Sequence, residues 1–141
     1  MNKKEEGVSP LFRIIDANLN RLKEGIRVCE DIQRYLFNEK NLSYRLKALR
    51  HEAFLKDYDK LLLARDIAND PLKKSVKSEL KRESLKDVAI SNMKRAQESA
   101  RVLEEILKLI DPNSSEKFKK IRYTLYDIEK EYFKDIDDEI W

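Results

Sequence analysis

An unusual set of polar side chains occurs twice in this chain at the same spacing. The first copy is Asn18, Arg21, Glu24, Arg27 and Glu30, and 74 residues later the second copy is Asn92, Arg95, Glu98, Arg101 and Glu104. A duplicated hydrophobic core explains repeated apolar residues but not repeated polar ones. Guanidinium forks bind phosphate, and an amide offers both a donor and an acceptor to the edge of a heterocycle. The repeat therefore indicates either a ligand site or a set of ion pairs.

Both interpretations place these side chains at the edge of a helical core. On a helix, Asn18, Arg21 and Gly25 share a stripe beside the main apolar face, and Ser99 takes the place of the glycine in the second copy. A mid-helix glycine costs about 1 kcal/mol relative to alanine. Gly25 therefore predicts a close approach by another helix or by a ligand.

Two alternatives stay open from these residues alone. In the structural one, Arg21 pairs with Glu98 and Arg95 pairs with Glu24, and these ion pairs set the register of two helices. In the functional one, the two Asn/Arg pairs converge on one anionic, hydrogen-bonding ligand.

Other residue types that could do chemistry are few. His51 is the only histidine and Cys29 the only cysteine, so together they are too few for a zinc site. We expect His51 to be a surface or capping residue and Cys29 to be a core residue. Asp66 and Asp70 suit Mg²⁺, which takes one or two carboxylates plus substrate phosphates, although turn chemistry explains their spacing equally well.

The elements that must position these residues are helices. The 141 residues are 40% charged and 41% hydrophobic, with only 2 glycines and 3 prolines, which favours long solvated helices in one domain, 1–141. Three-four spacing of apolar residues predicts four helices: one from Ser9 as N-cap to Phe37, one over 42–64 with a bend, one over 85–110 after a Ser84 cap, and one that is capped by Ser114 or Ser115 and extends to Ile136.

Short turns within each pair of helices favour an up-down-up-down four-helix bundle of two pseudo-symmetric hairpins. The internal repeat then covers about 12–65 and 86–136, residues 1–8 form a flexible tail, residues 137–141 form a second tail, and 66–83 is a connecting loop. A loop of this length either does something or is disordered, and its lysines and Arg82 make a lid over phosphates one option.

Charge and cysteine content exclude several classes. The net charge of +3 comes from interleaved signs, so no nucleic-acid surface is expected. No apolar run approaches the length of a membrane span. A single cysteine and the lack of a visible secretory signal predict a cytoplasmic protein. The long apolar helices also suit a homodimer.

Five sequence blocks in order carry a family resemblance. They are Asp16-Ala17-Asn18-x-x-Arg21-x-x-Glu24-Gly25-x-Arg27-Val28-x-Glu30-Asp31, then Leu49-Arg50-His51, Ala64-Arg65-Asp66, Asp70, and Asn92-x-x-Arg95-Ala96-Gln97-Glu98-x-x-Arg101-Val102-Leu103-Glu104-Glu105. From about Phe12 to Leu109 the chain resembles the alternative, all-helical type of hydroxymethylpyrimidine phosphate kinase of thiamine biosynthesis. That domain is often fused to a thiamine phosphate synthase barrel.

The resemblance implies a transferase reaction, a ligand set and a partner. ATP would phosphorylate 4-amino-5-hydroxymethyl-2-methylpyrimidine phosphate to its diphosphate with Mg²⁺ as cofactor, and thiamine phosphate synthase is the partner it suggests. Positioning and charge neutralisation can carry such a transfer without a strong base. The residues expected to act are Arg21, Arg95 and Asp66 in catalysis, Asn18, Asn92, Glu24, Glu98, Gly25, Arg50, His51 and Arg65 in substrate binding, and Asp66 and Asp70 at the metal.

Two further hypotheses stand beside the kinase. The first is a non-catalytic module that binds the pyrimidine diphosphate and passes it to a separate synthase. It is favoured by the lack of a glycine-rich phosphate loop, because the only glycines are Gly7 and Gly25. The second is a dimerisation bundle in which the repeated residues only set the register.

Overall fold

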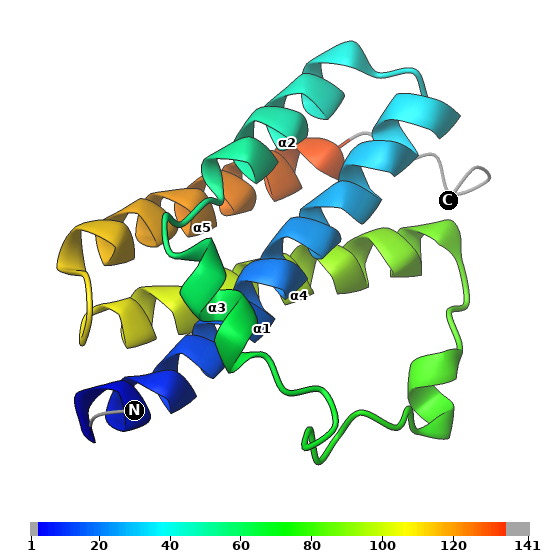
Figure 1. The fold of residues 1–141 in the computed structure, drawn as a ribbon. Coiled ribbons are helices and arrows are strands. Elements are labelled where there is room, and N and C mark those ends of the chain that lie inside the picture. Colours follow the sequence, from blue (N-terminus) through cyan, green and yellow to red (C-terminus); the bar gives the residue numbers. More distant parts are fainter. Residues whose placement is uncertain (1–2, 135–141) are drawn as a thin grey trace.

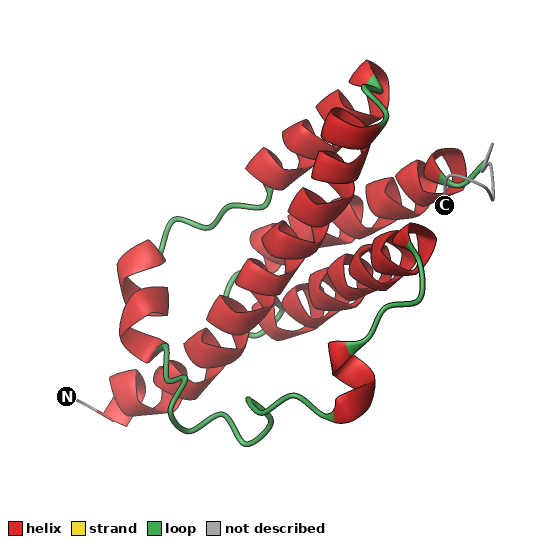
Figure 2. Cartoon of the chain, turned by 90° about the vertical axis from the view of Figure 1, so that its right-hand side faces the viewer, coloured by secondary structure: helices red, strands yellow, loops and turns green. Residues whose placement is uncertain are grey.

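The computed structural model describes residues 3–134, and the regular elements of this range are all helices. They are α1 (Lys3–Asp31), a π-helical segment (Ile32–Leu36), α2 (Lys40–Glu52), α3 (Tyr58–Ala64), a 3₁₀ segment (Lys77–Leu80), α4 (Leu85–Leu107) and α5 (Pro112–Tyr132). This range contains no strand (Figure 2), which confirms the all-α class. None of the described helices is both long and apolar enough to cross a bilayer.

The two most extensive helix–helix contacts in the fold both involve α4. This helix packs along α1 on one side and along α5 on the other, while α2 and α3 pack on α1. In Figure 1 the chain runs up α1, returns along α2, and later runs along α4 and back along α5. The core between these helices consists of fully buried side chains, among them Ile15, Leu22, Ile26, Cys29, Leu46, Met93, Leu103, Phe118, Ile121, Leu125 and Ile128.

The first helix starts earlier than its sequence predicts. It begins at Lys3 rather than after Ser9, and Pro10 lies inside it. The Ser9 cap is therefore wrong, and residues 3–8 of the expected tail belong to α1, while residues 1–2 lie outside the described residues. At its other end the helix widens into the π-helical segment Ile32–Leu36, so helical backbone ends close to the expected Phe37.

The helix expected over 42–64 is two helices, which corrects the four-helix count. Ala53 is fully buried, and its backbone leaves the helical region with ψ 74°. Its N–H donates to the carbonyls of Leu49 and Arg50, which ends α2. The chain then re-enters a helix at Tyr58, and Leu61 of α3 is buried against α1. The irregular apolar pattern after Ala53 therefore marks a break rather than a bend.

The last two helices, α4 and α5, are each capped at the N-terminus by a side chain that accepts a backbone N–H. The predicted Ser84 cap of α4 is confirmed, because its hydroxyl accepts the Asp87 N–H at 3.1 Å. For α5 the cap is Asp111, which accepts the Ser114 N–H at 3.3 Å, rather than Ser114 or Ser115. Ile136 and the expected tail 137–141 lie outside the described residues.

Candidate functional site

Most of the repeated polar residues make the same contact in both copies. The amide Nδ2 of Asn18 donates to the Ile14 carbonyl at 3.0 Å, and that of Asn92 donates to the Val88 carbonyl at 2.8 Å. Each asparagine thus satisfies a carbonyl four residues earlier in its own helix. This leaves the amide oxygen and the second N–H of each side chain available to other groups.

The outer arginines of the repeat also behave alike. Arg27 pairs with Asp31 at 3.4 Å and Arg101 with Glu105 at 3.2 Å, each at a spacing of four along its helix. All four side chains are about half exposed, so these are ordinary surface pairs of small energetic value.

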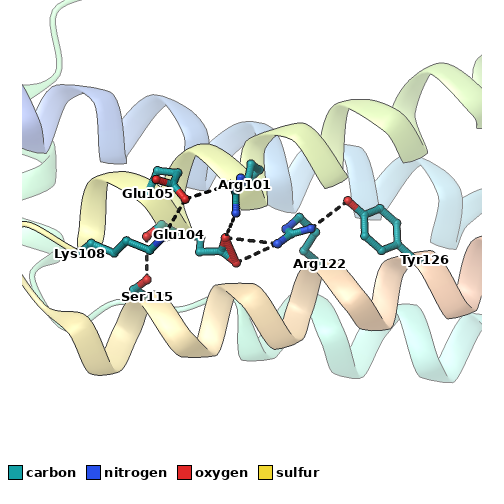
Figure 3. Close-up of polar contacts among 7 residues, drawn as sticks. All are labelled: Arg101, Glu104, Glu105, Lys108, Ser115, Arg122 and Tyr126. Carbon is teal, nitrogen blue, oxygen red and sulfur yellow. Dashed lines mark hydrogen bonds and ion pairs between the residues drawn. The ribbon is translucent and has the colours of Figure 1, made fainter.

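The last glutamates of the repeat are buried ion pairs to the neighbouring helix. Glu30 on α1 accepts from Arg50 on α2 at 2.8 Å and 3.4 Å, and Glu104 on α4 accepts from Arg122 on α5 at 3.0 Å and 3.2 Å. Figure 3 shows that Glu104 also meets Arg101. Each carboxylate is nearly inaccessible, so each arginine is required to balance it. Arg50 therefore has a structural partner in Glu30, and its expected role in substrate binding stays a prediction.

Gly25 also has a structural explanation. A Cβ at this position would lie 2.8 Å from the Asn92 carbonyl oxygen and 3.2 Å from the Ala96 Cβ. The glycine is what allows α1 and α4 to touch at this crossing, so the close approach predicted from sequence is made by a helix.

Four residues of the repeat are left without such a role. All four are exposed, and none makes a hydrogen bond or ion pair with another described residue. They are Arg21, Glu24, Arg95 and Glu98. The predicted pairs Arg21–Glu98 and Arg95–Glu24 are therefore absent from residues 3–134. Register pairing does not explain why these charges recur.

Arg21 lines a cavity of about 540 Å³ between α1 and the segment that follows α3. The α1 wall holds Arg13, Asp16, Asn18, Asn20 and Arg21 as its polar residues, and the opposite wall holds Arg65, Asp66 and Asp70. Five residues that the sequence singled out are thus brought together: Asn18, Arg21, Arg65, Asp66 and Asp70. Apolar surface comes from Pro10, Ile14, Ala17, Ile67 and Pro71.

Two side chains that sequence reasoning missed hold this cavity together. The carboxylate of Asp16 accepts two hydrogen bonds from Arg65, at 2.8 Å and 2.9 Å, and Arg13 donates to the Asp66 carbonyl at 3.0 Å. The hydrogen bond to Asp16 raises the pKa of Arg65 above its ordinary value, so this guanidinium stays charged. The sequence did contain a signal for Arg13. Arg13, Ala17 and Arg21 are spaced by four, so Arg13 shares a helix face with Arg21.

The two candidate metal ligands are engaged in turns. Asp66 accepts the Asn69 N–H at 3.1 Å and its Nδ2 at 2.6 Å, and these hydrogen bonds lower the pKa of Asp66. Asp70 accepts the Leu72 N–H at 2.9 Å. Among the described residues no group of three or more His, Cys, Asp or Glu side chains is arranged to hold a metal ion.

The other expected site residues lie elsewhere. Asn92, Arg95 and Glu98 are on α4 and do not line the cavity, and His51 is exposed near the end of α2. Cys29 is a buried core residue, as predicted, and burial raises the pKa of its thiol to about 12. A second cavity, of about 470 Å³, lies at the turn from α1 into α2 and is lined by Arg34, Lys40 and Lys47 together with Glu30 and Glu39.

Comparison with known proteins places the chain among proteins of thiamine biosynthesis. It is 37% identical over 129 residues to the thiamine-phosphate synthase of Nostoc punctiforme, which covers 91% of this chain. The enzymes of the same name from a Synechococcus species and from Thermosynechococcus vestitus are 41% and 39% identical over 83% and 85% of the chain. This chain spans only 34–37% of the length of these relatives. No solved structure matches it significantly.

These relatives correct the activity expected from sequence. The expectation was phosphorylation of a pyrimidine phosphate by ATP, whereas the relatives are named for thiamine-phosphate synthesis, a different step. No step of a kinase reaction is therefore assigned to Arg21, Arg95 or Asp66. The model of one family, described as the ThiD2 family, matches residues 13–131, which include every residue that lines the cavity except Pro10. The chain belongs to the ThiD2 family, a family linked to thiamine biosynthesis.

Proposed function

We propose that this domain binds a phosphorylated small molecule that is used or formed in the synthesis of thiamine phosphate. One observation carries the proposal: Arg13, Arg21 and Arg65, from two segments far apart in the sequence, line one cavity. Three guanidinium groups around one space are a common arrangement for phosphate recognition. The name of the relatives suggests which phosphorylated molecule it is, since thiamine phosphate is itself a phosphate ester.

The charge balance of the cavity identifies the group that meets the ligand. Arg65 is already neutralised by Asp16. Within the described chain Arg13 makes no ion pair; it donates to the Asp66 carbonyl, and its charge also acts on the Asp66 carboxylate. Arg21 has no ion pair with a described residue and is exposed. Arg21 is therefore the anion-binding residue of this proposal, with Arg13 beside it. The apolar surface of Ile14 and Pro71 then suits an organic ring attached to the phosphate.

The second copy of the repeat extends the proposal. Gly25, one turn after Arg21, touches α4 at Asn92 and Ala96, and Arg95 is next to Ala96. We include Asn92, Arg95, Glu24 and Glu98 as residues that flank the same helix crossing. The three charged ones make no hydrogen bond or ion pair with a described residue, while the Asn92 amide already donates to the Val88 carbonyl. A bundle of two pseudo-symmetric hairpins, with one Asn/Arg set in each half, is the architecture that this proposal assumes.

The domain is proposed to act together with a thiamine-phosphate synthase as part of a transferase system. Support comes from the relatives, in which the matched region is about a third of a protein with that name. Asp66 and Asp70 line the cavity and remain our candidates for a Mg²⁺ ion that would bridge carboxylate and phosphate.

Isothermal titration calorimetry tests the proposal. Wild-type protein is titrated with thiamine phosphate, inorganic diphosphate and thiamine, each with Mg²⁺ and with EDTA. We expect binding of the phosphorylated ligands, and a loss of about tenfold or more in Arg21→Ala, since charge-assisted hydrogen bonds contribute about 1.5–3 kcal/mol. Lys23→Ala, an exposed cation on the same helix, is the matched control and should bind normally. Equal affinity for thiamine and thiamine phosphate, or full binding by Arg21→Ala, would overturn the proposal.

A further inference from the structure

We infer that Asp16 is a positioning residue of the ligand site: its buried carboxylate fixes Arg65 and, through it, the wall of the cavity formed by residues 65–71. The inference rests on the proposed function, because it assigns Asp16 a role in that same site. It goes beyond the proposal by giving an acidic residue a favourable effect on binding an anion.

Burial is the first step of the argument. Asp16 is only 6% exposed, although it belongs to a residue type that is rarely buried without a partner. Arg65 holds both of its oxygens in a two-pronged contact, at 2.8 Å and 2.9 Å, and Asn20 adds a weaker hydrogen bond at 3.4 Å. The pair is therefore fixed in direction as well as in charge.

The second step is how residues 65–71 are held against α1. Within the described chain, the hydrogen bonds that join this segment to α1 come from two guanidinium groups, Arg65 to Asp16 and Arg13 to the Asp66 carbonyl. The other hydrogen bonds of the segment are local and include those from Asn69 to Asp66, from Asp70 to Ile67, from Leu72 to Asp70 and from Lys73 to Ala68. Ile67 is 75% exposed and adds little packing. The position of this cavity wall thus depends on the Asp16–Arg65 contact.

The third step makes the inference testable, because two mechanisms predict opposite signs. If Asp16 acts only through its charge, Asp16→Asn removes a negative charge from the cavity and tightens phosphate binding. If Asp16 positions Arg65, the same change loosens the wall and weakens binding. Asp70 lines the same cavity, and within the described chain its carboxylate accepts only from its own loop. With EDTA present no Mg²⁺ ion can use this carboxylate, so Asp70→Asn then reports the effect of charge alone.

The experiment measures the affinity for inorganic diphosphate by calorimetry, with EDTA present, in wild type, Asp16→Asn, Asp70→Asn and Arg65→Lys. We expect Asp16→Asn and Arg65→Lys to bind about tenfold more weakly, since small displacements in a built site are costly, and Asp70→Asn to bind equally or more tightly. Hydrogen exchange should show faster exchange at residues 66–72 in Asp16→Asn and unchanged exchange in α4. Arg65→Lys keeps the charge but loses the fork, so it tests the same contact if Asp16→Asn does not fold.

The outcomes separate the two proposals. No diphosphate binding by wild type would overturn the proposed function and this inference with it. Normal binding by wild type with equal or tighter binding by Asp16→Asn would overturn this inference alone.

Discussion

At the residue scale, arginines in this chain have two kinds of role, and the partner decides which. Arg50 and Arg122 each face a carboxylate with almost no exposed surface. Arg21 and Arg95 occupy equivalent places in the repeat, are exposed, and have no described partner. The first kind stabilises the fold, and the second kind is available to a ligand.

Removal of Arg122 tests the structural role. Glu104 would keep only the half-exposed Arg101 as a charged partner, so we expect Arg122→Ala to lower the free energy of unfolding, by up to about 3–5 kcal/mol. The double variant with Glu104→Gln should recover part of that loss, because it removes the stranded charge. Urea denaturation of the wild type and these two variants measures both effects. A loss below about 1 kcal/mol in Arg122→Ala would contradict the assignment.

The same pair gives a pH dependence with a defined sign. Burial alone would raise the pKa of Glu104, but hydrogen bonds from Arg122 and Arg101 outweigh it and hold the pKa below its ordinary value. A lowered folded pKa adds stability that is present above the unfolded value and lost as the pH falls through the folded one. The stability gap between wild type and Glu104→Gln should therefore shrink below about pH 4.

Sequence reasoning at this scale found some site residues and missed others. The repeat and the resemblance singled out Asn18, Arg21, Arg65, Asp66 and Asp70, which the fold brings to one cavity. They also singled out Arg50 and Gly25, whose contacts are structural. The partner of Arg50 is far away in the sequence, so a motif alone does not show that its charge is already used. Asp16 was missed because burial of a carboxylate depends on tertiary contacts.

At the element scale, the α1–α4 crossing is the contact on which the arrangement depends. Gly25 lies at that crossing, with the Asn92 carbonyl where a Cβ would be. The helices can come this close only because one of them lacks a side chain at this point. Ser99 is the residue at the repeated position on α4, and it is also buried.

Gly25→Ala separates helix propensity from packing. In an exposed helix this change stabilises by about 1 kcal/mol, but here the added methyl group meets a backbone atom, and overpacking costs about 1–3 kcal/mol. We expect a lower midpoint of thermal unfolding by circular dichroism. Lys23→Ala, exposed on the same helix, should change stability by less than about 0.5 kcal/mol. A higher midpoint for Gly25→Ala would contradict the close packing.

Helix existence was predictable, and helix boundaries were less so. The apolar periodicity located α1, α4 and α5, because each buries one continuous stripe against its neighbours. The interval 42–64 was wrong as a single helix because its two halves pack differently: Leu46 and Leu49 are buried in α2, while Leu62 and Leu63 of α3 are exposed. Periodicity does not distinguish a bend from a break when only part of the stripe is buried.

At the scale of the whole molecule, the family and the cavity point to the same chemistry from different directions. The relatives are named for the synthesis of a phosphate ester, and the cavity gathers three arginines beside apolar surface. The fold and the apolar periodicity do not indicate which ligand is bound, since helical bundles serve many functions. The activity first expected was wrong because the resemblance defined a pathway more reliably than a single step within it.

The central claim is that a phosphorylated ligand binds between α1 and residues 65–71. The most direct measurement is a two-dimensional NMR titration of labelled protein with thiamine phosphate. The account predicts that amide signals of residues 10–21 and 65–71 shift together and saturate, and that these shifts are lost in Arg21→Ala. Shifts confined to the second cavity, around Arg34 and Lys47, or no saturable shift at all, would contradict it.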